Sequence, residues 1–221
     1  MEIRKINLMG QMVEYQLNIK PIKRCYLKVV SGKIIVNSSP LFSIKDIEAL
    51  IIQNQETILK RLNSYVGKFD YCNGGFVNIF NRRYQIVSYD LNKRQVKIHG
   101  DKLYVYHHQI QNTIEMYLKE VLLQYITNKI QTYLQTSFKL MMPKIEIKKY
   151  KARWGACYPV NNKVSFNLAL VHLDKDLIDY VIVHELCHFL QANHSKLFYQ
   201  EIKKRLPDYQ KREKQLKEIG I

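Results

Sequence analysis

The chain has 221 residues, of which 47% are hydrophobic and 24% charged, a composition ordinary for a globular protein with one sizeable core or two small domains. It contains no run of about 18 uncharged apolar residues, which excludes a membrane-spanning helix. The N-terminus is charged early and lacks a continuous apolar segment, so we expect no signal peptide and a cytoplasmic protein.

The net charge bears on the kind of partner, and the cysteine spacing bears on the kind of metal or disulfide site. The chain has 35 basic and 19 acidic residues, a formal net charge of +16. This excess favours contact with nucleic acid or an acidic partner, although the basic residues are spread along the chain without an arginine-rich arm or a zinc-finger spacing. The four cysteines are scattered and form no CxxC pair, so they predict free thiols rather than a zinc ribbon or disulfide framework.

The front of the chain predicts mainly β structure. Extended runs flank Ser31-Gly32, where glycine permits a turn. Apolar residues at helical spacing predict an amphipathic helix over residues 43–65, with Ser43 as its N-cap. Turn-like separators divide the segment that follows into short strands, predicted at 76–80, 84–89, 94–98 and 102–107. No internal repeat is apparent.

The back of the chain is predicted to be richer in helices. A long apolar stripe predicts a helix over about 111–136. Strands are then predicted at 144–158 and 163–170, and helices at 176–191 (capped by Asp174), 195–206 and 207–219. We therefore expect an α+β fold with a strand-rich region over 1–105 and a helix-rich region over 106–221, which together form one unit of family length.

The stretch VIVHELCHFLQANHS carries the strongest chemical signal. Residues four apart on a helix project from one face, so His184 and His188 can reach one metal ion. Glu185 flanks that row, where a carboxylate can deprotonate a metal-bound water. His194 is the natural third ligand, because catalytic zinc takes three protein ligands and leaves one position to water. Asn193 tolerates left-handed geometry and is expected to end the helix.

Other interpretations of this stretch are weaker. The spacing equals that of the metzincin pattern, but Gln191 stands where metzincins have glycine, so a metzincin fold is disfavoured. A helix whose histidines merely cap or hydrogen-bond would not explain an apolar helix with a third histidine at ligand spacing. If His194 is not the third ligand, His172 or Glu201 is the alternative.

Several motifs in fixed order carry a resemblance to a known family. Arg153-Trp154-Gly155-Ala156-Cys157, Asn167-Leu168, Asp179 through His188, Asn193-His194-Ser195 and Phe198-Tyr199 resemble the YgjP-like metal-dependent hydrolases, which are zincin-type metallopeptidases. The chain departs from that pattern at Ala156 and Tyr199. The resemblance spans nearly the whole chain, with specific motifs only from about residue 150 onward, and SprT-like proteases are similar more distantly.

The resemblance implies a zincin-like C-terminal half in which His184, His188 and His194 bind zinc and Glu185 is catalytic. The RWGAC stretch has two interpretations of equal weight. In the first, Arg153 binds a substrate carboxylate or stabilises the oxyanion, and Trp154 forms the floor of the cleft. In the second, Trp154 packs in the core and Arg153 pairs with an acid such as Glu146.

These observations lead to one main hypothesis and two alternatives. The main hypothesis is a zinc-dependent metallopeptidase in which zinc-bound water attacks an amide carbonyl of a peptide or protein substrate, while Glu185 accepts the proton and passes it to the leaving nitrogen. The first alternative is a basic nucleic-acid-associated binding protein with a structural or vestigial metal site. Glu185 argues against it, because a structural site needs no base. The second is a hydrolase of a non-peptide bond.

Overall fold

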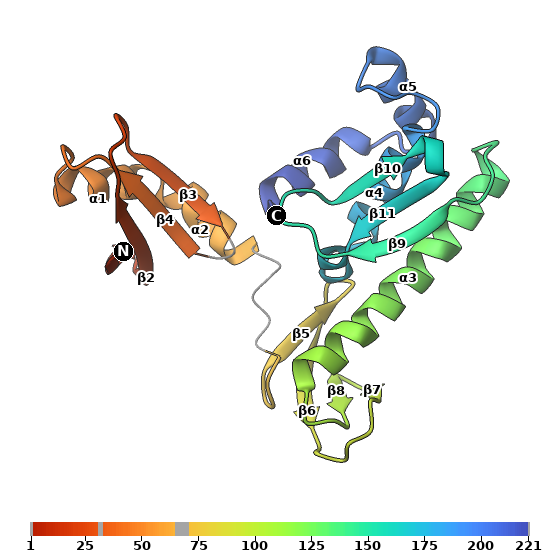
Figure 1. The fold of residues 1–221 in the computed structure, drawn as a ribbon, viewed down its shortest axis with the longest axis horizontal. Coiled ribbons are helices and arrows are strands. Elements are labelled where there is room, and N and C mark those ends of the chain that lie inside the picture. The colour runs from red at the N-terminus through yellow and green to blue at the C-terminus, as the bar shows by residue number, and fades with distance from the viewer. Residues whose placement is uncertain (1, 31–32, 65–70, 221) are drawn as a thin grey trace. The chain divides into compact units, whose positions relative to one another are not determined.

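The computed structural model describes residues 2–30, 33–64 and 71–220 (Figure 1). It is a mixed α+β structure with most strands in the N-terminal half and most helices in the C-terminal half, which confirms the expected fold class at this level. Within those three ranges, no helix combines the length and the apolar character needed to cross a bilayer.

The chain divides into two compact units, one formed by Met1–Lys68 with Lys217–Ile221 and the other by Phe69–Leu216. The division therefore lies at residues 68/69 and not near residue 105, where the sequence predicts it. The reason is that four strands from the front of the chain pack in the same unit as the long helix and the elements that follow it. That the two predicted regions together form one unit of family length stays a prediction.

The first unit is a four-stranded sheet with two helices. Its strands are β1 (Glu2–Leu8), β2 (Gln11–Ile19), β3 (Tyr26–Val30) and β4 (Lys33–Ser38), in the order β1-β2-β4-β3. The helix predicted over 43–65 is two helices, α1 (Ile44–Gln53) and α2 (Gln55–Ser64). Ser43 caps α1 as predicted, in a reciprocal capping box with Asp46. The turn predicted at Ser31-Gly32 lies outside the described residues.

The second unit begins with a sheet of the same topology. Strands β5 (Phe76–Ile79), β6 (Arg82–Ser88), β7 (Val96–His99) and β8 (Lys102–Val105) lie in the order β5-β6-β8-β7. In both sheets the outer pairs are antiparallel and the central pair is parallel.

The register of the two sheets is the same as well. Tyr15 pairs with Ile34 in the first sheet, and Ile86, at the equivalent place after its turn, pairs with Leu103 in the second. The first hairpin of each sheet turns through two residues with positive φ, Met9-Gly10 and Phe80-Asn81. The chain therefore contains a repeated four-stranded module that its sequence does not reveal.

The rest of the second unit carries the motifs on which the family resemblance rests. Helix α3 (Ile110–Thr136) precedes a three-stranded sheet of β9 (Lys144–Lys148), β10 (Gly155–Tyr158) and β11 (Lys163–Asn167), in the order β10-β11-β9. The 3-10 helices η1 (Pro159–Asn161) and η2 (Leu168–His172) flank β11, and helices α4 (Lys175–Cys187), α5 (Lys196–Arg205) and α6 (Tyr209–Ile219) follow.

In this part of the second unit, the three-stranded sheet packs against helices α3 and α4. The strand predicted over 144–158 is two strands on opposite sides of β11, and the strand predicted over 163–170 ends at Asn167, where η2 begins. Helix α3 contacts β9, helix α4 contacts β10, and the two helices contact each other. Strand β10 is consequently an edge strand that lies against α4.

Candidate functional site

Helix α4 is held in place by a buried apolar surface and one polar anchor. Tyr180, Val181, Ile182 and Val183 are all buried, as expected from the apolar run that they form. Asp179, only 7% exposed, accepts hydrogen bonds from the Tyr125 hydroxyl at 2.6 Å and the Lys129 ammonium at 2.8 Å, both on α3. A buried carboxylate needs such partners, and here they fix α4 to α3.

The end of α4 differs from the prediction. The helix ends at Cys187 with His188 as its C-cap, rather than continuing to Gln191, because the amide groups of Phe189 and Leu190 bond back three residues and tighten the last turn. Asn193 has no positive φ, so the expected left-handed residue is absent from this bend. The chain then reverses, and Ser195 caps α5 through its side-chain oxygen.

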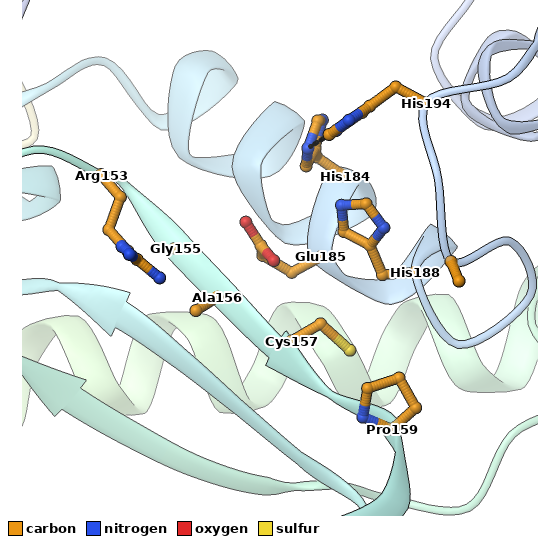
Figure 2. Close-up of a pocket in the computed structure, with 10 residues that line it drawn as sticks. Arg153, Gly155, Ala156, Cys157, Pro159, His184, Glu185, His188 and His194 are labelled. Atoms are coloured by element: carbon orange, nitrogen blue, oxygen red, sulfur yellow. Dashed lines mark hydrogen bonds between the residues drawn. The ribbon is translucent and has the colours of Figure 1, made fainter.

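The bend brings His194 back to the histidines of α4. The side chains of His184, His188 and His194 each offer one ring nitrogen, and these atoms lie within 4.8 Å of one another (Figure 2). The Nε2 atoms of His184 and His194 are 3.0 Å apart. His188 donates its Nδ1 proton to the carbonyl of Gln191 at 3.2 Å, which leaves its Nε2 with a free lone pair.

Phe198 packs against all three histidines, a contact that the sequence does not predict. Its fully buried ring lies 5.0, 4.6 and 4.7 Å, between centroids, from the rings of His184, His188 and His194. The Nδ1 atom of His184 is buried and has no hydrogen-bond partner in the described part of the chain. Ring packing therefore orients that imidazole. The sequence marks Phe198 only as part of the Phe198-Tyr199 motif and by its position one turn past the Ser195 cap.

Burial keeps two of the three imidazoles, those of His184 and His188, neutral. Burial, reinforced by the charges of His188 and His194, lowers the pKa of His184 to about 3. Burial also lowers the pKa of His188, although its hydrogen bond to Gln191 opposes the shift. Neutral imidazoles are the form that binds a metal ion, so these two side chains are ready for coordination at neutral pH.

Glu185 lies in the same cavity as the three histidines. The cavity has a volume of about 430 Å³ and is lined by Arg153, Gly155, Ala156, Cys157, Pro159, His184, Glu185, His188, Ala192 and His194. The carboxyl of Glu185 points toward β10 (Figure 2). Burial raises the pKa of Glu185 to about 8, and the nearby positive charge of Arg153 opposes the shift. A carboxyl poised near neutral pH is suited to proton transfer.

In the RWGAC stretch, Arg153 lines the cavity and Trp154 does not. Arg153 is exposed at the cavity and forms no ion pair with any residue in the described ranges. Glu146, the alternative partner, pairs with Lys148 and Lys163 instead. Trp154 is half-buried and does not line the cavity, so the structure does not bring it to the floor of the cleft.

Asn167 holds the loop that carries Arg153. Its side-chain amide donates to the carbonyls of Tyr150 and Arg153, both at 3.0 Å, and its backbone amide donates to the carbonyl of Trp154 at 2.8 Å. Asn167 is 2% exposed, so these bonds are shielded from water. The loop and the start of β10 are consequently fixed.

The remaining candidates lie elsewhere. His172 donates its Nδ1 proton at 2.6 Å to the carbonyl of Asn78, which does not line the cavity. Glu201 forms ion pairs with Lys204 and Arg205. Neither of these alternatives for a third ligand reaches the cluster. None of the four cysteines forms a disulfide, as expected, and Cys157 lines the cavity.

Three imidazoles and a carboxyl share one cavity of the second unit, and these are the types of side chain that metal-dependent hydrolases use. Comparison of the sequence with known families finds the YgjP-like metallopeptidase domain over residues 23–219. The chain belongs to this family, which makes it a metallopeptidase in general terms.

Other comparisons add little. No curated protein sequence matches the chain. Among solved structures it is similar to the metallopeptidase zymogen of Pyrococcus abyssi abylysin, at 20% identity and a TM-score of 0.35, over 43% of this chain and 89% of that one. So distant a likeness carries no argument about function. None of these three comparisons supports a nucleic-acid partner.

Proposed function

We propose that the protein is a zinc-dependent metallopeptidase in which His184, His188 and His194 hold the metal and Glu185 transfers the proton. One observation carries the proposal: the three imidazoles converge within 4.8 Å in a cavity that also holds the Glu185 carboxyl. The expected peptide or protein substrate follows from membership of a metallopeptidase family.

The donor set fits zinc. Nitrogen ligands around tetrahedral zinc lie roughly 3.3 Å apart, given zinc–nitrogen distances of about 2.0–2.1 Å. The 3.0 Å between the Nε2 atoms of His184 and His194 is close to that spacing. Three imidazole nitrogens suit zinc better than they suit calcium or magnesium, which prefer oxygen ligands. When bound, zinc would supply Lewis acidity to a water molecule and to the scissile carbonyl.

The role of Glu185 follows from its position in the same cavity as the three histidines. Its carboxylate accepts a proton from the attacking water at an Oε atom and returns that proton to the leaving nitrogen. Its side chain is 6% exposed, so bulk water does not compete for the proton. A purely structural metal site would have no use for a buried carboxyl beside its ligands.

The protein surface around the cluster is suited to an extended substrate. Strand β10 is the edge of its sheet, so its outer side is open to backbone pairing with a peptide. We propose that Arg153 binds either a substrate carboxylate or the oxyanion. The role proposed for Trp154 in binding rests on the sequence alone, since it does not line the cavity.

The test is substrate profiling of the zinc-loaded protein against a peptide library, beside the Glu185→Gln variant. We expect the wild-type protein to cleave a subset of peptides and the variant to retain zinc and fold while losing turnover about 10²- to 10⁴-fold, the usual contribution of a general base. A variant as fast as the wild type would refute the mechanism. Cleavage of esters or other non-peptide bonds alone would assign a different hydrolase.

A further inference from the structure

Gly155, the first residue of β10, lies directly against the side chain of Glu185 (Figure 2). A Cβ atom at position 155 would lie 2.7 Å from Oε1, 2.8 Å from Cγ and 2.9 Å from Cδ of Glu185. Real Cβ atoms essentially never approach another atom within 3.0 Å. The φ angle of Gly155 lies outside the left-handed region that favours glycine, so this glycine is required for space and not for backbone conformation.

The backbones on both sides of this contact are held in place. Glu185 is buried on α4, which Asp179 fixes to α3 through Tyr125 and Lys129. On the opposite side, Gly155 pairs with the fully buried Phe166 of β11. The residue before it, Trp154, is bonded through its carbonyl to the backbone of Asn167. A side chain at position 155 would therefore displace the carboxyl, including its stem, and not the strand.

We propose that Gly155 is a positioning residue for the reaction: the missing side chain lets the Glu185 carboxyl sit against the β10 backbone, and that backbone forms the wall that sets its distance from the histidines. The catalytic meaning of this contact rests on the function proposed above. The steric part does not, because the collision exists whatever Glu185 does. A displacement of about 1 Å at a reacting group is enough to cost roughly 10²-fold in rate.

A double-mutant cycle between the two positions tests the proposal. Gly155→Ala is made in the wild-type background and in a Glu185→Ala background, where all three colliding atoms are gone. We expect it to lower the melting temperature by roughly 5 °C in the wild-type background, as overpacking does, and by less than about 1 °C beside Glu185→Ala. Zinc content should be unchanged and turnover should fall about 10²-fold at similar KM.

A second glycine provides the matched control. Gly100 has a positive φ of 62° and open space around it, so Gly100→Ala strains the backbone without a collision. It should lower the melting temperature in both backgrounds equally and leave turnover intact. If Gly155→Ala behaves like Gly100→Ala, or leaves the rate unchanged, the proposal is overturned.

The melting measurements need no substrate, so they separate this proposal from the proposed function. If Glu185→Gln keeps full turnover, the catalytic meaning of the contact falls with the proposed function, while the melting cycle still decides the steric claim. If Gly155→Ala does not fold alone, recovery of folding in the double variant supports that claim, and failure of both variants overturns it.

Discussion

Phe198 packs its ring against that of His188 with 4.6 Å between centroids and 33° between planes. The same ring lies within 5.0 Å of the two other candidate ligands. Histidine ligands are usually oriented by a hydrogen bond from the ring nitrogen that does not bind the metal. His188 has such a bond, to Gln191, whereas Nδ1 of His184 has none within the described residues. The contact with the Phe198 ring therefore orients the imidazole of His184, which no hydrogen bond from Nδ1 orients.

We expect Phe198→Ala to weaken zinc binding although it removes no ligand. Loss of a buried phenylalanine costs about 3–5 kcal/mol of stability, and part of that loss here should appear as lower zinc affinity, because the imidazoles become free to rotate. A decrease of about 10- to 100-fold in affinity, the usual effect of losing an orienting group, is expected. Titration of the metal-free protein with zinc measures it.

Ile202→Ala is the control for this prediction. Ile202 is fully buried one turn further along the same helix, and the cavity lining does not include it. Its truncation should cost about 2–5 kcal/mol in stability with zinc affinity unchanged. Equal losses of affinity in both variants would mean that α5 as a whole, and not the ring, positions the histidines.

His194→Ala should reduce zinc affinity directly, since it removes one of three ligands. His194 is the exposed member of the cluster, so its loss leaves little cavity and the metal-free protein should melt close to the wild type. The stabilisation that zinc gives to the folded state should shrink with the affinity. The measurement is the melting temperature with and without a chelator for both proteins. An unchanged chelator effect would place the third ligand elsewhere.

Local patterns in the sequence predict much of this arrangement. The helix at 110–136, the cap at Ser43 and the helix pair around Pro207 follow from apolar spacing and turn chemistry, which act over a few residues. The approach of His194 to His184 follows from ligand spacing alone. These features depend on residues that are neighbours in the chain.

Contacts between distant segments are not visible in the same way. The sequence marks Gly155 only as part of a motif, because its meaning is the collision with Glu185, thirty residues away. Likewise, the repeated sheet is hidden because Tyr15 and Ile86 share a buried position and a pairing but not a residue type. The early end of α4 comes from the hydrogen bonds that Phe189 and Leu190 make three residues back, and the apolar spacing used to predict the helix does not reveal them.

Arg153 provides a test of substrate recognition that distinguishes its two proposed roles. If it binds a substrate carboxylate, Arg153→Met should raise KM about 10- to 100-fold for peptides with a free C-terminus and leave amidated peptides unaffected, because a hydrogen bond to a charged group is lost. If it stabilises the oxyanion, kcat should fall about 10²-fold for both kinds of peptide. Unchanged kinetics on both would remove Arg153 from either role. Arg153→Lys, which keeps the charge, is the matched control.

His172 gives the protein a specific dependence of stability on pH. It is 8% exposed, with Nδ1 at 2.6 Å from the carbonyl oxygen of Asn78 and Nε2 at 3.4 Å from the Tyr71 hydroxyl. Burial lowers its pKa from 6.5 to about 4, and the bond to Asn78 opposes the shift. Between these two pKa values the unfolded chain binds more protons than the folded one, so the free energy of unfolding falls as the pH drops.

The predicted loss from His172 begins near pH 6.5, where the unfolded side chain titrates, and is complete below about pH 4. It amounts to about 3 kcal/mol at 1.36 kcal/mol for each unit of pKa difference. His172→Asn removes the titration and keeps an amide donor near the position of Nδ1. Urea unfolding at pH 7 and pH 4.5 should therefore show a smaller loss of stability in this variant than in the wild-type protein. Because His184, His188 and His194 are present in both proteins, their contribution cancels in the comparison. Parallel pH profiles for the two proteins would show that His172 is protonated in the folded state as readily as in the unfolded chain.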